Sequence, residues 1–392
     1  MPLTGVRVLD FGRYIAGPYC AALLADYGAD VIRIEAPSGN DDRFSVPVAD
    51  DGSGGMFLQM NRNKRCLTLK PNSDDGREII RRLLVDTDVV VANLPDEVLE
   101  KLGLDYESVS AINPRIILAT ASSFGPEGPR ANEVGFDAVG QAMSGALYLS
   151  GTEGAPSRAQ VNYVDFGTAL HLAFGVMAAL RTRDQTEKGQ RVSTSLFGTA
   201  LAYTNGTTIE HAVTGIVRPP AGNRAFSSGP TDVFRTDDGW IMTQIVGDAI
   251  FRRWTALVGQ PELADDPRFA SDINRGDHGA ILSDIMQRWC DGQSRDTVLT
   301  KMAAARLPAA PVLEPAEVLQ EPQVAAMGLV EPIDYPSAAA PVPIIRAPIH
   351  LSDSPKQGHV RAPLLGEHSD EILRAIGYDA EEIARLKQAA IV

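Results

Sequence analysis

The apolar positions at the start of the chain predict a strand, a helix and a second strand. Residues 6–11 form a short apolar run that is typical of a buried strand. Residues 19–27 place alanines and leucines on one side of a helix, and Gly28 follows where a C-cap glycine belongs. Residues 31–35 have the alternating pattern of a strand. This order and length predict two parallel strands joined by a right-handed crossover.

The alternation of strands and helices continues along the first half of the chain. The pattern predicts strands at 66–69, 88–92 and 116–121, and helices at 75–85, 95–102 and 168–180. The run 88–92 is almost entirely apolar, as in a strand buried on both faces. Residues 192–197 predict either a further strand or the entry to a helix. Together these elements indicate a doubly wound α/β domain.

From about Pro219 the pattern becomes that of a second, smaller region. Residues 233–235 and 240–246 flank a turn of two aspartates and a glycine, which predicts a β-hairpin. Helices follow near 249–259 and 279–291. Prolines then mark an extended return, and the final segment is helical and charged.

Charge and cysteine content exclude several classes of function. The 392 residues include 36 basic and 50 acidic side chains, a formal net charge of −14, which disfavours nonspecific binding to nucleic acid or anionic membranes. Cys20, Cys66 and Cys290 are too scattered for a disulfide framework or a metal site, and the six histidines are equally dispersed. We therefore expect no metal and a reducing cytoplasm. We also expect no secretory signal and no membrane span, since no apolar run reaches about 20 residues.

Two segments near the N-terminus could bind phosphate groups. The turn after the first strand offers only Gly12 and Gly17, which lacks the three close glycines of a nicotinamide-dinucleotide site, so they are interpreted as turn residues. The run Asn61-Arg62-Asn63-Lys64-Arg65, followed by Lys70, is the densest basic cluster. It is either a solvated turn or a phosphate-binding edge beside the sheet.

Asp165 is the most suggestive carboxylate. It directly precedes the apolar helix 168–180, where Asp is a favoured N-cap, and position alone favours that structural role. Helix N-terminal amides also favour the ionised form of a carboxylate, and such a group could act as a nucleophile.

Motifs in a fixed order along the whole chain carry a family resemblance. They are LTGVRVLDFGRYIAGPYCAALLADYGADVIRIE (3–35), NRNKRCLTL (61–69), LGLDYESVSAINPRIILATASSFGPEGP (102–129), GFDAVGQAMSG (135–145), VDFGTALHLAFGVMAAL (164–180), KGQRVSTSLF (188–197), VFRTDDGW (233–240), PELADDPRF (261–269), PAAPVLEPAEVLQEPQVAAMGLV (308–330) and PLLGEH (363–368). With them the chain resembles the class III coenzyme A transferases, the family of formyl-CoA transferase and carnitine CoA-transferase, which also includes α-methylacyl-CoA racemase.

The resemblance implies a two-domain architecture and a dimer. A large Rossmann-like CoA-binding domain is expected from both chain ends, residues 1–215 and 330–392. A smaller inserted α+β domain with linkers is expected over 220–328. Family members look like interlocked homodimers in which each subunit is a ring threaded through the other.

The resemblance also implies an acyl-CoA:carboxylate CoA-transferase with Asp165 as the nucleophile. It implies acyl-CoA and small carboxylic acids as substrates and no tightly bound cofactor. The residues that match the family's coenzyme site are Ile15, Ala16, Leu69, Lys70, Asn93, Leu94, Lys101, Phe136 and Asp137. Ala36 and Pro95-Asp96 stand where many relatives carry arginine, so phosphate contacts are expected to move to Arg33, Arg43 or the run 62–65.

Two alternative functions remain open. Racemases of this family read Gly-His-Asp where this chain reads Gly135-Phe136-Asp137, and a phenylalanine cannot shuttle the α-proton. A CoA-binding protein without catalysis would need Asp165 to serve only as a helix cap. The sequence therefore favours transfer over both.

Overall fold

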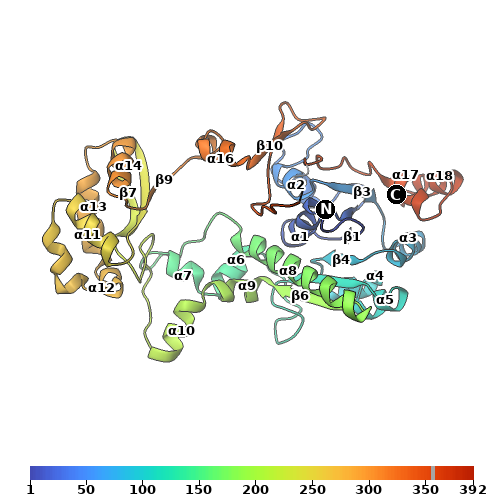
Figure 1. The fold of residues 1–392 in the computed structure, drawn as a ribbon. Helices are drawn as coiled ribbons and strands as arrows, with labels where there is room; N and C mark the ends of the chain where they lie inside the picture. Colours follow the sequence, from blue (N-terminus) through green and yellow to red (C-terminus); the bar gives the residue numbers. More distant parts are fainter. Residues whose placement is uncertain (355–357) are drawn as a thin grey trace. The chain divides into compact units, whose positions relative to one another are not determined.

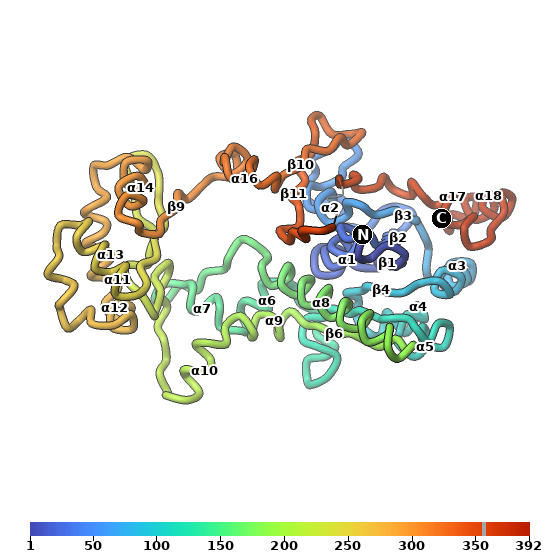
Figure 2. The backbone as a smooth tube through the Cα atoms, viewed as in Figure 1, coloured from blue at the N-terminus to red at the C-terminus, as the bar shows by residue number. Residues whose placement is uncertain are grey.

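The first and last segments of the chain fold together around one sheet (Figures 1 and 2), in a computed structural model that describes residues 1–354 and 358–392. The larger of two compact units combines Met1–Ser144, Gln160–Thr204 and Pro322–Val392. The smaller unit combines Gly145–Ala159 and Asn205–Glu321.

The larger unit is built on six parallel strands in the order β3-β2-β1-β4-β5-β6. Val8 lies opposite Val31 on one side and opposite Val89 on the other, so β1 and β4 meet at the point where the strand order reverses. The predicted parallel pair is confirmed, and the order is that of a doubly wound sheet. The strands are β1 (Arg7–Asp10), β2 (Asp30–Glu35), β3 (Lys64–Thr68), β4 (Val89–Ala92), β5 (Ile117–Ser122) and β6 (Arg191–Ser195).

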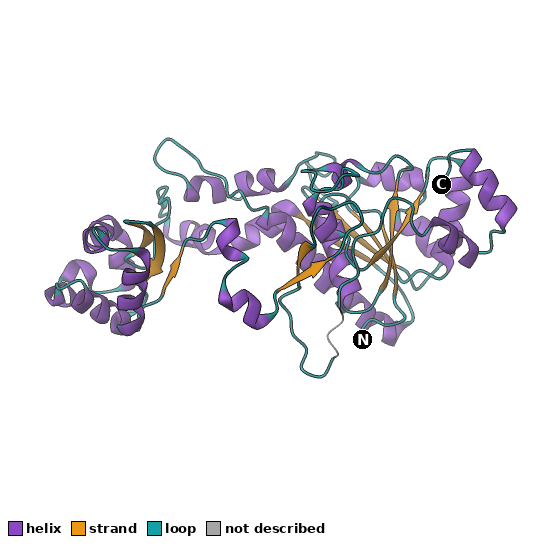
Figure 3. Ribbon diagram, turned by 90° about the horizontal axis from the view of Figure 1, so that it is seen from above, coloured by secondary structure: helices purple, strands orange, loops and turns teal. Residues whose placement is uncertain are grey.

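Helices cover both faces of this sheet (Figure 3), because its strands are apolar on both sides. One face packs against α3 (Asp74–Val85), α4 (Asp96–Leu102), α5 (Tyr106–Ile112), α17 (Ser369–Ala375) and α18 (Ala380–Gln388). The other face packs against α1 (Ala16–Asp26) and α8 (Tyr163–Thr186). The helical C-terminal tail is thus confirmed, as two helices separated by a turn.

Helix α8 is longer than its apolar pattern predicts. It begins at Tyr163 rather than at 168, so Asp165 is the third residue of the helix, and the N-cap is Asn162. The interpretation of Asp165 as the N-cap is therefore wrong. By length and composition α8 is the one helix of the described residues that could cross a membrane, with half of its apolar window buried. The expectation that the chain has no membrane span stays a prediction.

Shorter elements complete the larger unit. Residues 192–197 belong to both predicted structures, because β6 runs directly into α9 (Leu196–Tyr203). The other elements are η1 (Asp41–Phe44), α2 (Gly55–Met60), α6 (Asp137–Met143), α16 (Pro322–Met327) and the antiparallel pair β10 (Val330–Ile333) and β11 (Val342–Ile345).

The smaller unit contains the predicted hairpin. Strands β7 (Thr231–Thr236) and β8 (Gly239–Gln244) pair antiparallel, and β9 (Ala309–Pro311) joins them. The sequence predicts three core aromatics for this region, Trp240, Phe251 and Trp254. Phe251 and Trp254 are fully buried in its core, which confirms the prediction for these two. Trp240 lies on β8 and is 48% exposed, so for this residue the prediction is wrong. Its helices are α7 (Ala146–Ser150), α10 (Asn205–Thr214), α11 (Asp248–Leu257), η2 (Pro261–Asp265), η3 (Pro267–Phe269), α12 (Asp272–Asp277), α13 (Gly279–Cys290), α14 (Arg295–Ala304) and α15 (Pro315–Val318).

Candidate active site

A cavity of about 420 Å³ lies at the carboxyl ends of β1, β4 and β5. Its walls include 13–16 after β1, 93–98 after β4, 121–123 at the end of β5, and Asp165 on α8. Open α/β sheets bind ligands where the strand order reverses, since the loops diverge there and leave a crevice. The cavity therefore occupies the position that the fold itself favours for a ligand.

The loop after β1 is held by buried charges. The Gly12 N–H donates to Asp10 at 2.8 Å, and the Gly12 carbonyl accepts from Arg33 at 2.7 Å. The Tyr14 N–H donates to Asp42 at 3.2 Å. A Cβ at Gly12 would lie 2.7 Å from Pro18, so only glycine fits this turn. This close contact accounts for a glycine at position 12, and no dinucleotide-binding motif is needed to explain it.

Asn93 clamps the same loop from the neighbouring strand. Its side-chain oxygen accepts from the Arg13 N–H at 2.7 Å, and its side-chain amide donates to the Arg13 carbonyl at 2.8 Å. Both ends of the Asn93 amide are thus engaged by backbone. Its direct contribution to the site is to fix the position of Arg13.

The predicted phosphate cluster is largely internal. Lys64 is buried and donates to Asp10 at 2.7 Å, and burial lowers its pKa to about 8. Arg62 is buried and pairs with Asp26 at 2.6 Å. Arg65 pairs with Asp30 at 2.7 Å and also with Glu371.

Arg33 and Arg43, the other candidates for phosphate binding, are also buried. Arg33 pairs with Asp42 at 2.8 Å, and Arg43 pairs with Glu35 at 2.6 Å. Both guanidinium groups are enclosed by the fold and paired with carboxylates, so neither presents an exposed donor to a ligand. The expectation that Arg33, Arg43, Arg62 or Lys64 holds the coenzyme phosphates is therefore wrong, because these cations neutralise carboxylates within the fold.

Asp137 and Asp165 are adjacent at the start of α8. One carboxylate oxygen of Asp137 accepts from the Val164 N–H at 2.8 Å and from the Asp165 N–H at 3.1 Å. Its other oxygen accepts from the side chain of Gln141. Asp137 therefore caps α8 from a different helix, and it is buried.

The Asp165 carboxyl is half-buried in the cavity wall, and its pKa is raised to about 7 by burial and, secondarily, by the charge of Asp137. The position at the start of a helix predicts that the amides keep this group ionised. That expectation fails because Asp137 already accepts from those amides and places a like charge beside Asp165. The arrangement yields a carboxyl group that titrates near neutral pH in a ligand-sized cavity.

The structure gathers most of the residues predicted to bind the coenzyme. Ile15, Ala16, Asn93, Leu94 and Phe136 all line the cavity together with Asp165. The ring of Phe136, which is 66% exposed, meets Tyr14 edge-on at 5.8 Å.

Four of the predicted residues do not line this cavity. Leu69 is fully buried after β3, and Lys70 is exposed and donates its N–H to the Ile391 carbonyl. Lys101 is exposed in the last turn of α4, and Asp137 lies beneath α8 as its cap. Their roles toward a ligand stay predictions.

Two further residues of the site, Arg13 and Tyr14, are not singled out by any sequence motif. Both line the cavity beside Ile15. The available signal was their position, because residues that directly follow the first strand of such a sheet reach the crevice.

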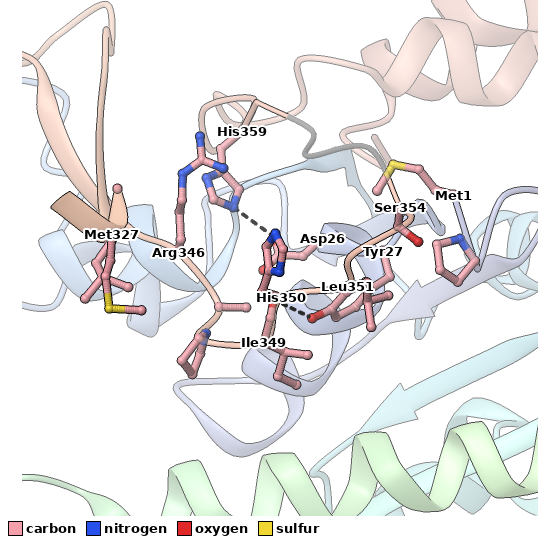
Figure 4. A pocket seen from close by; sticks show the side chains of 15 residues that line it. Met1, Asp26, Tyr27, Met327, Arg346, Ile349, His350, Leu351, Ser354 and His359 are labelled. Carbon is pink, nitrogen blue, oxygen red and sulfur yellow. Dashed lines mark hydrogen bonds and ion pairs between the residues drawn. The ribbon is translucent and has the colours of Figure 1, made fainter. Parts of the chain in front are cut away.

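A second cavity, of about 210 Å³, lies beside the end of α1 (Figure 4). His359 lies between Glu331, 2.8 Å from its Nδ1 atom, and Asp26, 3.4 Å from its Nε2 atom. Arg62 and Arg346 pair with these carboxylates in turn. The cluster ties the C-terminal return segment to α1, and every charged group in it has a protein partner.

Residues 1–354 and 358–392 contain no set of side chains that could coordinate a metal ion. No group of three or more His, Cys, Asp or Glu side chains is placed to hold an ion. The three cysteines are free and buried.

Comparison with known proteins assigns the family. The family model of CoA-transferase family III matches residues 3–369. An acyl-CoA transferase of Fusarium pseudograminearum is 33% identical over 403 positions, covering 100% of this chain and 88% of that protein. Succinyl-CoA–D-citramalate CoA-transferase of Chloroflexus aurantiacus is 31% identical over 400 positions, covering 100% and 98%.

A solved structure agrees with these matches. The crystal structure of a CAIB/BAIF family protein from Brucella suis superposes with a TM-score of 0.84 at 33% identity, covering 96% of this chain and 99% of that one. The chain thus belongs to CoA-transferase family III and is a CoA-transferase enzyme.

Proposed function

We propose that the protein is an acyl-CoA:carboxylate CoA-transferase in which Asp165 forms the covalent intermediates. The observation that carries this proposal is the half-buried carboxyl of Asp165 in the cavity at the strand-order reversal. Burial removes water from the ionised carboxylate, and a poorly solvated carboxylate is a stronger nucleophile.

The first half of the reaction moves CoA from the donor onto the enzyme. The ionised Asp165 attacks the thioester carbonyl of the donor, the carbon–sulfur bond breaks, and CoA leaves as the thiolate. The product is a mixed anhydride between the donor acyl group and Asp165. The thiolate then attacks the aspartyl carbonyl of this anhydride, which releases the donor acid and leaves an aspartyl-CoA thioester.

The second half reverses these steps with a new acid. The acceptor carboxylate attacks the aspartyl-CoA thioester, which expels the thiolate and forms a second mixed anhydride. The thiolate attacks the acyl carbonyl of the acceptor, which yields the new acyl-CoA and frees the Asp165 carboxylate. No proton or electron is lost in the cycle, so the site needs one nucleophile and the exclusion of water.

The cavity wall supports a role for several residues in holding the coenzyme. Ile15, Ala16, Leu94 and Phe136 supply apolar surface, and Asn93 fixes the loop that carries the first two. Ligand sites of this kind are predominantly apolar with a few placed polar groups. We propose that the pantetheine arm of CoA lies along this wall toward Asp165.

Racemisation of a 2-methylacyl-CoA is the second candidate function. It needs an acid and a base on opposite sides of the α-carbon. Among the described residues that line the cavity, none is a histidine, and Phe136 occupies the position of the racemase His. Incubation in deuterated water with a 2-methylacyl-CoA should give no enzyme-dependent α-deuterium, and incorporation would favour the racemase function.

Trapping of the covalent intermediate tests the proposal directly. Wild-type enzyme is incubated with a panel of acyl-CoA donors, treated with hydroxylamine, and digested for mass spectrometry. We expect a hydroxamate on Asp165, and none in Asp165→Asn. A label on another carboxylate, or normal transfer by Asp165→Asn, would rule out this assignment.

We also propose that the protein forms the interlocked homodimer of its family. Leu170, Phe174 and Met177 follow one side of α8 and are 45%, 76% and 43% exposed. Such an apolar strip on the surface is commonly covered by another subunit. A cytoplasmic location, without nucleic-acid or membrane partners, stays a prediction from composition.

A further inference from the structure

The cavity that contains Asp165 has an uneven set of charges. Four acidic residues line it, Asp96, Glu97, Glu133 and Asp165, and the one basic residue among the described lining residues is Arg13. Coenzyme A carries phosphate groups, and the whole chain has a formal charge of −14. An anionic ligand therefore needs a local cation to offset the surrounding field.

Two arginines outside the cavity lining are paired with carboxylates of its wall. Arg191 pairs with Asp96 at 2.7 Å, and Arg130 pairs with Glu133 at 2.8 Å. In the described part of the chain, by contrast, no carboxylate lies within ion-pair distance of the exposed Arg13 side chain, whose contacts here are those of its backbone. Its guanidinium is thus free to bind a ligand.

The backbone of Arg13 is fixed before any ligand arrives. Asn93 binds both its N–H and its carbonyl, while Asp42 holds the N–H of the next residue. A cation on a rigid loop loses less conformational entropy on binding than one on a mobile loop. The guanidinium fork also matches the paired oxygens of a phosphate or a carboxylate.

We infer that Arg13 is the anion-recognition residue of this site. It binds an anionic group of the acyl-CoA substrate, either a phosphate of the coenzyme or a free carboxylate at the far end of a dicarboxylic acyl group. The inference rests on the proposed function in placing acyl-CoA in this cavity. It assigns to Arg13 the charge recognition that the buried basic run cannot provide.

Four thioesters separate the two sources of the anion. They are succinyl-CoA, butyryl-CoA, succinyl-pantetheine and butyryl-pantetheine. The two CoA esters carry the nucleotide phosphates, and the two succinyl esters carry a distal carboxylate. Their dissociation constants are measured by calorimetry in an Asp165→Asn background, which prevents turnover. Arg13→Gln is compared with Arg13→Lys and with Arg81→Gln, an exposed cation of α3 that pairs with Glu78 away from the cavity and gives the same change in net charge.

We expect Arg13→Gln to weaken binding about tenfold or more for the thioesters that carry the recognised anion, with Arg13→Lys retaining part of the affinity. Loss confined to both CoA esters identifies the phosphates, and loss confined to both succinyl esters identifies the acyl carboxylate. Unchanged binding of all four, or an equal loss for all four including butyryl-pantetheine, overturns the inference. Circular dichroism verifies that each variant is folded. Because binding is measured without turnover, failure to trap Asp165 in the wild type would refute the mechanism and leave this result standing.

Discussion

The Asp165 N–H donates to the Asp137 carboxylate at 3.1 Å, so the cap of α8 and the proposed nucleophile are neighbours. Asp137 stabilises the start of the helix and at the same time places a negative charge beside Asp165. One carboxylate thus fixes the position of the second and raises its pKa.

The pH dependence of transfer follows from this pair. The nucleophile must be ionised, and the pKa of Asp165 is raised to about 7 by burial and by Asp137. We expect the acid limb of kcat/KM to rise as the pH increases through about 7. Stopped assays between pH 5 and 9 measure this limb. They use a donor thioester whose parent carboxylic acid is ionised over the whole range.

Asp137→Asn tests the electrostatic part of the same effect. Asparagine keeps an oxygen that can accept from the N–H groups of Val164 and Asp165 but removes the charge. The acid limb should therefore move to lower pH, while burial keeps the pKa of Asp165 above 3.8. A limb that stays in place would mean that Asp137 does not influence the nucleophile through its charge.

Asp165→Asn should stabilise the fold at neutral and higher pH. The pKa of Asp165 is 3.8 in an unfolded chain and about 7 in the folded protein, so between these values only the unfolded chain releases the proton. The free energy of unfolding of the wild type consequently falls as the pH rises from about 4 to 7, by at most about 4 kcal/mol. Contact of the half-buried carboxyl with water makes the loss smaller than this limit. Urea unfolding at pH 4 and pH 8 should show a gain for the variant of about 1–3 kcal/mol at pH 8 and little at pH 4. An equal difference at both pH values would contradict the raised pKa.

Arg62→Gln should impair stability rather than coenzyme binding. Arg62 is buried against Asp26, and the loss of one member of a buried pair costs about 3 kcal/mol or more. Arg65→Gln is the matched control from the same run, because its pair with Asp30 is partly exposed and is worth about 0–1 kcal/mol. Urea unfolding gives the stability, and calorimetry gives the affinity for CoA. A loss of CoA affinity in stably folded Arg62→Gln would restore the phosphate role expected from the sequence.

Asn93→Ala should raise the KM for acyl-CoA more than it lowers kcat. The change removes both hydrogen bonds that fix Arg13, each worth about 1 kcal/mol, so an increase of up to about thirtyfold is expected. Asn132→Ala is the control, since Asn132 lines the same cavity from the loop after β5. Equal effects of the two substitutions would argue against the clamp.

Phe174→Glu tests the proposed dimer. Phe174 is 76% exposed in the middle of the apolar strip on α8, and a charge there should oppose burial against a second subunit. Ala111→Glu makes the same change of charge on the exposed side of α5. Light scattering should give a dimer for the control and smaller or aggregated species for Phe174→Glu. A stable dimer of Phe174→Glu would exclude this strip from the interface.

The sequence by itself determined the elements whose patterns are local. The apolar runs of β1 and β4 and the helical periodicity of α3 predict those elements closely, because backbone geometry and burial act on neighbouring residues. The order of strands and helices also predicts the doubly wound sheet, since crossover handedness leaves few alternatives. The motif at the start of α8 singled out Asp165, although its place in the helix was wrong by a few residues.

Only the tertiary structure decided which charges are available. Lys64 meets Asp10 across 54 positions of sequence, and Arg62 meets Asp26 across 36. No local pattern distinguishes these buried cations from Arg13, which stays exposed at the cavity. The pKa of Asp165 likewise depends on burial and on Asp137, 28 positions earlier in the chain. Charge–charge distances and desolvation are properties of residues that folding brings together, so a one-dimensional pattern can propose such a site but cannot set its electrostatics.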